Sequence, residues 1–215
     1  MGDIISATET FVKKTLVNAE AGHGWWHIHR VRHNALRIAK AEGANLLIVE
    51  LGALLHDIAD HKFHQGDHER GSRVAREWLE SQRLDSAIVD TVCDVVFHVS
   101  FRGLRAENGM ESLEGKCVQD ADRLEGIGAI GIARTIIYGA TIGRALYDPD
   151  GPVLSLDAPW HVDVHTPSPS TIHHFYEKIL HVKDWMHTPT GQALAEERHI
   201  FTQQYLNQFF KEWNQ

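Results

Sequence analysis

The sequence predicts an all-α protein built as a single-domain helical bundle, and three observations support this. Apolar residues recur at spacings of three and four along most of the chain, as they do in amphipathic helices. No stretch shows the sustained alternation of apolar and polar residues that marks a strand. The composition, 43% hydrophobic and 23% charged over 215 residues, is that of a globular protein with one substantial core. No shift in composition marks a boundary, so we expect one domain over residues 1–215.

Each predicted helix is a stretch whose apolar residues fall on one face. The first, for example, carries Ile5, Val12 and Leu16 on one side. The predicted helices are 4–20, 26–42, 45–59, 68–82, 85–98, 112–123, 124–142, 170–187 and 189–213. Two long segments lack such periodicity: 99–111, which is polar and contains glycine, and 144–169, which holds five of the six prolines.

Charge and composition exclude several classes of protein. With 21 Lys and Arg against 29 Asp and Glu, the formal charge of -8 disfavours binding to nucleic acid or to an anionic membrane. The N-terminus lacks the pattern of a signal peptide, and the apolar stretch 127–142 is interrupted by Arg134. Cys93 and Cys117 have no metal or redox spacing. We therefore expect a cytoplasmic protein that binds neither nucleic acid nor membrane.

Histidine is unusually frequent, with 16 scattered residues, and histidine is the commonest metal ligand in proteins. His27 shares a helix face with residues that point to the interior. His56 and Asp57 follow a long apolar run, so they lie where a buried helix emerges. Asp122 lies in an apolar-flanked segment, where a carboxylate needs a partner. These four residues are the candidate metal ligands.

Two imidazoles and two carboxylates form a mixed nitrogen and oxygen donor set. Such a set suits Mn²⁺, Fe²⁺, Co²⁺, Ni²⁺ or Zn²⁺ better than Ca²⁺. Spacing alone leaves other roles open, because His27 could cap a helix and Asp122 could pair with Arg123 or Lys116. Asp60 follows His56 by four residues and so shares its helix face.

The arrangement of His27, the His56–Asp57 pair and Asp122 resembles the HD-domain metal-dependent phosphohydrolase superfamily. The wider context resembles its YpgQ/YedJ-like bacterial branch. The segments that carry the resemblance are HGWWHIHRVRHNALRIA (23–39), LGALLHDIADHKFH (51–64), VQDADRLEGIGAIGIAR (118–134), HHFYEKIL (173–180) and MHTPTGQALAEERHIF (186–201). One departure is Gly24, which stands after His23 where the branch often has an aspartate.

The resemblance implies a fold, a cofactor and a ligand set. The fold is a helical bundle of the HD-domain type, with a metal-binding core at about 20–140 and C-terminal helices 170–213 packing on it. The cofactor is one divalent ion, Mn²⁺ first, with Mg²⁺, Fe²⁺, Co²⁺, Ni²⁺ and Zn²⁺ as alternatives. Its ligands are His27, His56, Asp57 and Asp122.

The resemblance also implies catalytic residues. In related phosphohydrolases an acidic residue three positions after the aspartate of the HD pair acts on the attacking water, and Asp60 occupies that position here. Lys62 lies in a short turn near the metal pair and is the second catalytic candidate. The substrate needs local positive charge and a lined pocket, for which the candidates are Arg30, His98, Arg102, Arg123 and Lys178. We further expect loop 99–111 to border the pocket and to be mobile without substrate.

The resemblance to the YpgQ/YedJ-like branch implies a nucleoside triphosphate pyrophosphohydrolase, which releases pyrophosphate and a nucleoside monophosphate. The partner is therefore a phosphorylated small molecule, expected to be a nucleotide, and a homodimer is left open. One alternative is a nucleotidase or phosphodiesterase at the same site. Another is a non-catalytic regulatory protein that binds a metal or a nucleotide. A di-iron HD oxygenase would need a second ligand set, which the sequence does not offer.

Overall fold

Helices are the only regular secondary structure in the part of the chain that the structure describes. The structure is a computed structural model that describes residues 2–17, 24–59, 67, 69–99, 109–156 and 168–214. Across these ranges it contains helices, turns and irregular segments and no β-strand, so the all-α prediction is confirmed. The chain divides into two compact units, the first made of described residues up to 122 and the second of those from 123 onward. The single domain stays a prediction.

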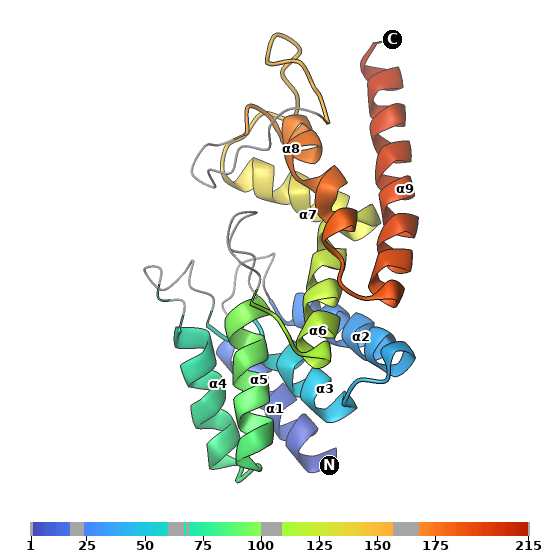
Figure 1. The fold of residues 1–215 in the computed structure, drawn as a ribbon. Helices are drawn as coiled ribbons and strands as arrows, with labels where there is room; N and C mark the ends of the chain where they lie inside the picture. The colour runs from blue at the N-terminus through green and yellow to red at the C-terminus, as the bar shows by residue number, and fades with distance from the viewer. Residues whose placement is uncertain are drawn as a thin grey trace. The chain divides into compact units, whose positions relative to one another are not determined.

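The first unit contains six helices, five of them complete within it (Figure 1). The sixth, α6, ends at the boundary between the units. They are α1 (Gly2–Thr15), α2 (Trp25–Glu42), α3 (Leu46–Leu55), α4 (Arg70–Ser81), α5 (Ser86–Val99) and α6 (Leu113–Arg123).

Helix α3 is the core element of the first unit. It is apolar almost all round, which is the pattern of a helix with neighbours on several sides, and it packs against α1, α2 and α5. Leu51, Leu54 and Leu55 are completely buried. Gly52 allows α5 to approach closely, since a Cβ atom there would lie 3.0 Å from Val95 Cγ1. The burial of α3 therefore fixes where its C-terminal end emerges.

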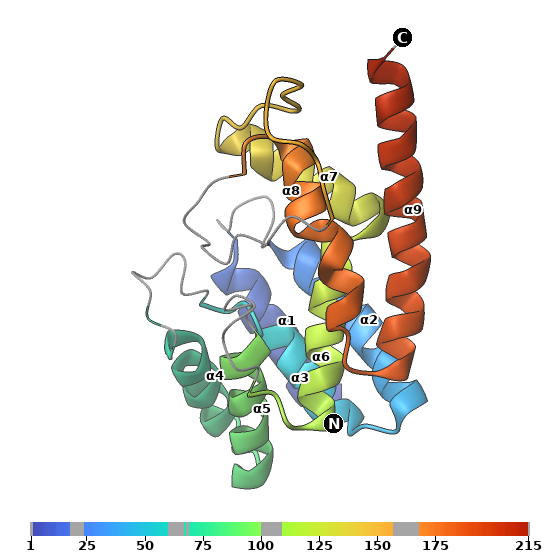
Figure 2. The ribbon, with the colours of Figure 1, turned by 45° about the horizontal axis from the view of Figure 1, so that its top comes forward.

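A three-residue turn makes α2 and α3 antiparallel (Figure 2). Gly43 ends α2 with a φ of 77°, a left-handed conformation that glycine adopts without strain. Asn45 caps α3, and its side-chain oxygen accepts hydrogen bonds from the backbone N–H groups of Leu47 and Ile48. The beginning of α2 and the end of α3 therefore lie at the same end of the helix pair.

Helix α6 is held to the first unit near both of its ends. The Asn45 backbone N–H donates to Glu114 Oε1 at 2.9 Å, which ties the first turn of α6 to the α2–α3 turn. Near the other end, Gln119 Nε2 donates to the backbone oxygen of His98 at 3.0 Å. These bonds set the position of the last turn of α6, which carries Asp122.

The second unit contains the remaining helices, of which α7 and α9 pack against each other. Gly128 N–H donates to Thr202 Oγ1 at 2.9 Å, and Arg198 Nη1 donates to Leu124 O at 2.5 Å. None of the described helices, including the long α9, combines the length and apolarity needed to cross a bilayer. The elements are η2 (Leu124–Gly126), α7 (Gly128–Thr141), α8 (Thr171–Glu177), η3 (Ile179–Trp185) and α9 (Pro189–Trp213).

Two predicted helices, 124–142 and 170–187, are each broken in the structure. The first divides into η2 and α7 at Ile127, whose backbone is extended (φ −130°, ψ 164°). The second divides into α8 and η3 at Lys178, whose φ of −135° and ψ of −57° are not helical. The spacing of apolar residues does not reveal these breaks. A single non-helical residue interrupts the helix, but the apolar residues before and after it still face the core. Likewise, α3 ends at Leu55, and residues 56–59 form a turn instead of the predicted continuation.

The core position of α3 leads to a stability prediction. Leu51→Ala should lower the free energy of unfolding by about 2–5 kcal/mol, because it removes a buried side chain and leaves a cavity. Leu46→Ala is the matched control, since Leu46 begins the same helix and is 40% exposed, and it should cost much less. Urea unfolding of both variants measures the difference. Equal losses would contradict the placement of α3 at the centre of the core.

Candidate metal centre

Four side chains from three segments of the first unit converge on one point. The Nε2 atoms of His27 and His56 lie 3.2 Å apart. His27 Nε2 lies 3.4 Å from Asp57 Oδ2 and 3.3 Å from Asp122 Oδ1. His56 Nε2 lies 3.7 Å and 3.8 Å from the same two oxygens. The cluster thus brings together two imidazole nitrogens and two carboxylate oxygens.

The fold explains why these residues meet. His27 lies in the first turn of α2, while His56 and Asp57 directly follow α3. The antiparallel arrangement of α2 and α3 places these segments at the same end of the pair. Because α3 stops before His56, the pair lies in a turn, where two adjacent side chains can face one point. Asp122 comes from the last turn of α6, and both histidines are buried.

A backbone hydrogen bond orients His56. Its Nδ1 lies 2.8 Å from the carbonyl oxygen of Ala53. A carbonyl only accepts, so Nδ1 carries the proton, and the Nε2 lone pair of the neutral ring points into the cluster. This is the arrangement found for metal-binding histidines, whose second nitrogen is held by a carbonyl or a carboxylate.

The electrostatics of the cluster favour a cation. Burial by itself would raise the pKa of the Asp122 carboxyl. The hydrogen bond from His27 and the charge interaction with His56 outweigh burial and lower this pKa to about 2. Asp122 is therefore ionised at neutral pH, as a metal ligand must be. A neutral His27 could donate one proton to only one of the three acceptor atoms around its Nε2. A cation would satisfy all of them.

The spacing of the donor atoms fits a transition-metal ion. Ligand atoms at about 2.0–2.2 Å from an ion lie roughly 3.0–3.6 Å from their neighbours. Each imidazole nitrogen lies 3.2–3.8 Å from the other three donor atoms. His27, His56 and Asp57 form a group whose donor atoms lie close enough together to hold an ion. The residues present therefore fit a divalent metal with mixed nitrogen and oxygen ligands.

Two other predicted site residues of the first unit, Arg30 and His98, lie on α2 and α5. Arg30 is half-buried on α2, one turn beyond His27. The His98 ring is engaged elsewhere: its Nδ1 lies 3.1 Å from both the backbone oxygen and Oδ1 of Asp94, and its Nε2 faces Gly109. The described contacts therefore do not join His98 to the cluster.

Arg123 and Lys178 belong to the second unit. The Arg123 guanidinium donates to the backbone oxygen of Trp185 and contacts His187 Nε2 at 2.9 Å, so it holds the end of η3. Lys178 lies at the break between α8 and η3. Their roles in substrate binding stay predictions.

The remaining predicted residues, Asp60, Lys62 and Arg102, lie outside the described residues. The same holds for residues 100–108, which make up most of the predicted pocket loop 99–111. The roles of these residues and of the loop also stay predictions.

Sequence reasoning missed two groups that position the ligands. The Ala53 carbonyl that orients His56 carries no side-chain signal. Gln119 stands in the segment QDADRL, three residues before Asp122, but its burial and its hydrogen bond to His98 became evident only in the structure. Ala53 thus orients the His56 ligand directly, whereas Gln119 fixes the helix that carries Asp122.

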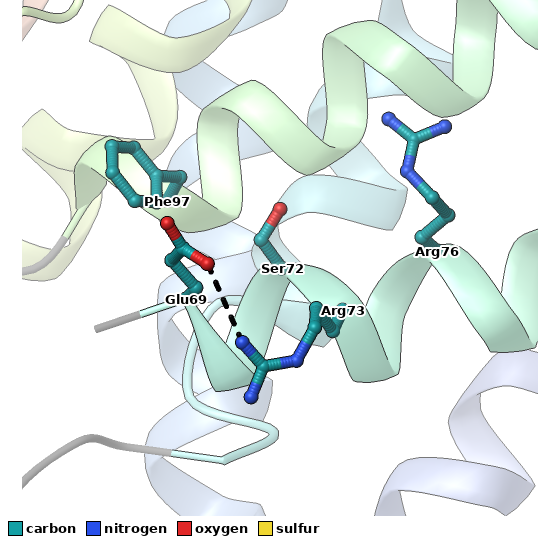
Figure 3. A pocket seen from close by; sticks show the side chains of 5 residues that line it. All are labelled: Glu69, Ser72, Arg73, Arg76 and Phe97. Carbon is teal, nitrogen blue, oxygen red and sulfur yellow. Dashed lines mark hydrogen bonds and ion pairs between the residues drawn. The ribbon is translucent and has the colours of Figure 1, made fainter. Parts of the chain in front are cut away.

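The described residues of the first unit also line a separate cavity of about 210 Å³ (Figure 3). Glu69, Ser72, Arg73, Arg76 and Phe97 surround it. Its two arginines already contact carboxylates: Arg73 contacts Glu69 at 3.5 Å within the cavity wall, and Arg76 contacts Asp90 at 2.7 Å. None of the predicted site residues lines this cavity.

Comparison with known proteins identifies the family. A model of the HD domain matches residues 25–127, a range that contains all four clustered residues. YpgQ of Bacillus subtilis is 36% identical over 205 residues, which cover 94% of this chain and 90% of YpgQ. The chain belongs to the HD superfamily. The predicted family is thereby confirmed.

Solved structures agree with this assignment. An HD-superfamily hydrolase from Bacillus thuringiensis is 38% identical, with a TM-score of 0.78 and coverage of 99% of this chain and 98% of that one. The structure of YpgQ in complex with ADP has 32% identity, a TM-score of 0.73 and coverage of 97% of each chain. The HD protein described here is therefore a hydrolase, and HD domains bind divalent metal ions.

The geometry of the cluster predicts how metal binding responds to Asp122. Asp122→Asn should weaken Mn²⁺ binding by at least about 100-fold, because changing even a residue behind the ligands commonly costs 10–100-fold. Calorimetric titration of Mn²⁺ into chelator-treated protein measures the affinity. Glu77→Gln is the control, since Glu77 is an exposed carboxylate on α4. Unchanged affinity in Asp122→Asn would exclude Asp122 as a ligand.

Proposed function

We propose that this HD hydrolase cleaves a nucleoside triphosphate into pyrophosphate and a nucleoside monophosphate. The proposal rests above all on the convergence of His27, His56, Asp57 and Asp122, which offers one divalent ion four donor atoms. The nucleotide is supported by the relative YpgQ, which has been solved in complex with ADP. The anhydride bond is what the resemblance to the YpgQ-like branch implies.

In this proposal the four residues hold one ion, with Mn²⁺ as the first candidate. When bound, such an ion lowers the pKa of a coordinated water and polarises a phosphoryl oxygen. The protein's own part is to fix the donors. Ala53 holds His56 in the tautomer that presents Nε2, and Gln119 holds the last turn of α6, from which Asp122 reaches the cluster.

Asp60 and Lys62 are proposed to act on the reacting atoms. Asp60 takes the proton of the attacking water, since a carboxylate three residues after Asp57 lies in the sequence beside the ligands. Lys62 offers charge to the phosphoryl group that is transferred. The other residues proposed to bind the substrate are Arg30, His98, Arg102, Arg123 and Lys178.

A screen of phosphorylated compounds tests the function directly. The purified protein, supplied in turn with Mn²⁺, Mg²⁺, Co²⁺, Ni²⁺, Zn²⁺ or anaerobic Fe²⁺, is offered nucleoside tri-, di- and monophosphates and phosphodiesters. Phosphate and pyrophosphate are quantified separately. We expect pyrophosphate from nucleoside triphosphates and loss of turnover after chelation. Release of phosphate alone from monophosphates would instead identify a nucleotidase, and cleavage of diesters a phosphodiesterase.

Asp60→Asn separates catalysis from metal binding. This variant keeps the size of the side chain and removes the proton acceptor. Turnover should fall by about 10²–10⁴-fold, the range for general acid–base groups, while the metal content by elemental analysis stays at one ion per chain. Asp122→Asn should lose both metal and turnover. Wild-type turnover in Asp60→Asn would show that another group accepts the proton.

A further inference from the structure

Helix α7 of the second unit, which the structure describes in full, is apolar on the side that faces solvent. No exposed residue of this helix is charged. Its one charged residue, Arg134, is half-buried and contacts Glu125 Oε2 at 3.4 Å. The outer face of α7 is formed mainly by the exposed residues Ile130, Ala133, Ile137, Tyr138, Ala140 and Ile142. Helices α4 and α9, in contrast, expose charged residues such as Glu80 and Lys211.

The inner face of α7 makes its closest contacts through glycine. The helix packs against η2, α8 and α9 of its own unit (Figure 1). A side chain at Gly131 would clash with the backbone of Gly126, and one at Gly139 would clash with Thr171. The larger side chains Ile137 and Tyr138 point outward instead. A surface helix normally has a polar outer face, and a helix that is apolar on all sides is normally covered on all sides.

The outer face is large enough to take part in an interface. Its four large residues, Ile130, Ile137, Tyr138 and Ile142, are each between 42% and 57% exposed. A half-exposed side chain of this size offers roughly 100 Å² to a partner, so with the exposed alanines the face offers roughly 500 Å². An uncharged apolar patch of this extent on a water-soluble domain marks a surface that binds something.

The absence of charge on the outer face indicates which partner fits it. Two copies related by a two-fold axis present the same face to each other, so any charge on that face would meet a like charge. An uncharged face avoids this repulsion, and its alanines leave room for the isoleucine and tyrosine side chains of the other copy. Helices that lie on membranes carry Lys and Arg beside their apolar face, whereas no exposed residue of α7 is basic.

We propose that a second copy of this chain covers the outer face of α7, so that the two α7 helices pack against each other in a two-fold dimer. If each copy contributes about 500 Å², the dimer buries about 1,000 Å² in total, which is at the lower limit for a specific interface. Such an interface gives a reversible dimer with a dissociation constant in the micromolar range. The dimer needs neither the metal nor the proposed hydrolysis, so its test is separate from theirs.

Sedimentation velocity of the full chain tests the dimer. Between about 1 µM and about 500 µM protein, the wild type should change from monomer to dimer. Ile137→Glu and Tyr138→Glu each place a carboxylate in the apolar contact, opposite the same charge on the other copy, and should weaken dimerisation at least about 100-fold. Leu46→Glu is the matched control, because Leu46 is an exposed leucine on α3 of the first unit. This variant should dimerise like the wild type.

Thermal unfolding of dilute protein shows whether the chain itself covers the face. Because Ile137 is exposed in the single chain, Ile137→Glu should melt within about 2 °C of the wild type at concentrations where both are monomers. A large loss of stability there would overturn the proposal. So would a wild type that stays monomeric at the highest concentration, or a dimer that both glutamate variants leave intact. A monomeric wild type that binds phosphatidylcholine vesicles would assign the face to a lipid surface and overturn the proposal as well.

Discussion

Burial of α3 is the constraint on which the first unit depends. This helix has leucine, valine and alanine on nearly every face, and it can leave water only if other helices surround it. Helices α1, α2 and α5 do so. Polar side chains can follow only where α3 ends, and the residues at that position are His56 and Asp57. The hydrophobic effect thus determines where the two central ligands of the candidate metal centre lie.

The turn between α2 and α3 brings the first metal-ligand candidate to the buried end of α3. Because Gly43 and Asn45 reverse the chain within three residues, His27 returns to the end of α3 that carries His56. Asp122 is positioned by α6, which hydrogen bonds of Glu114 and Gln119 attach to the rest of the first unit at two points. A cluster of acceptor atoms repels itself unless it binds a cation or a proton. The packing energy of the core is what holds the two imidazole nitrogens 3.2 Å apart and the two carboxylate oxygens within 3.3–3.8 Å of them.

In the first unit, imidazole and carboxylate acceptors face one another at one point, which calls for a cation. A cation bound there would in turn attract a phosphate. A protein with a formal charge of -8 gains no general attraction for phosphates, so any phosphate must be held by such local groups. Charge at individual sites, rather than the net charge, is therefore what relates this structure to phosphorylated ligands.

The sequence by itself determined the helical class, the HD family and the four clustered residues. Apolar periodicity reports which face of a helix is buried, and the motif residues lie in short segments that can be recognised without coordinates. The breaks at Ile127 and Lys178, the end of α3 at Leu55 and the engagement of Arg123 with η3 were decided only by the tertiary structure. The physical reason is that backbone breaks and hydrogen-bond partners depend on which distant groups come into contact, and apolar periodicity carries no record of those contacts.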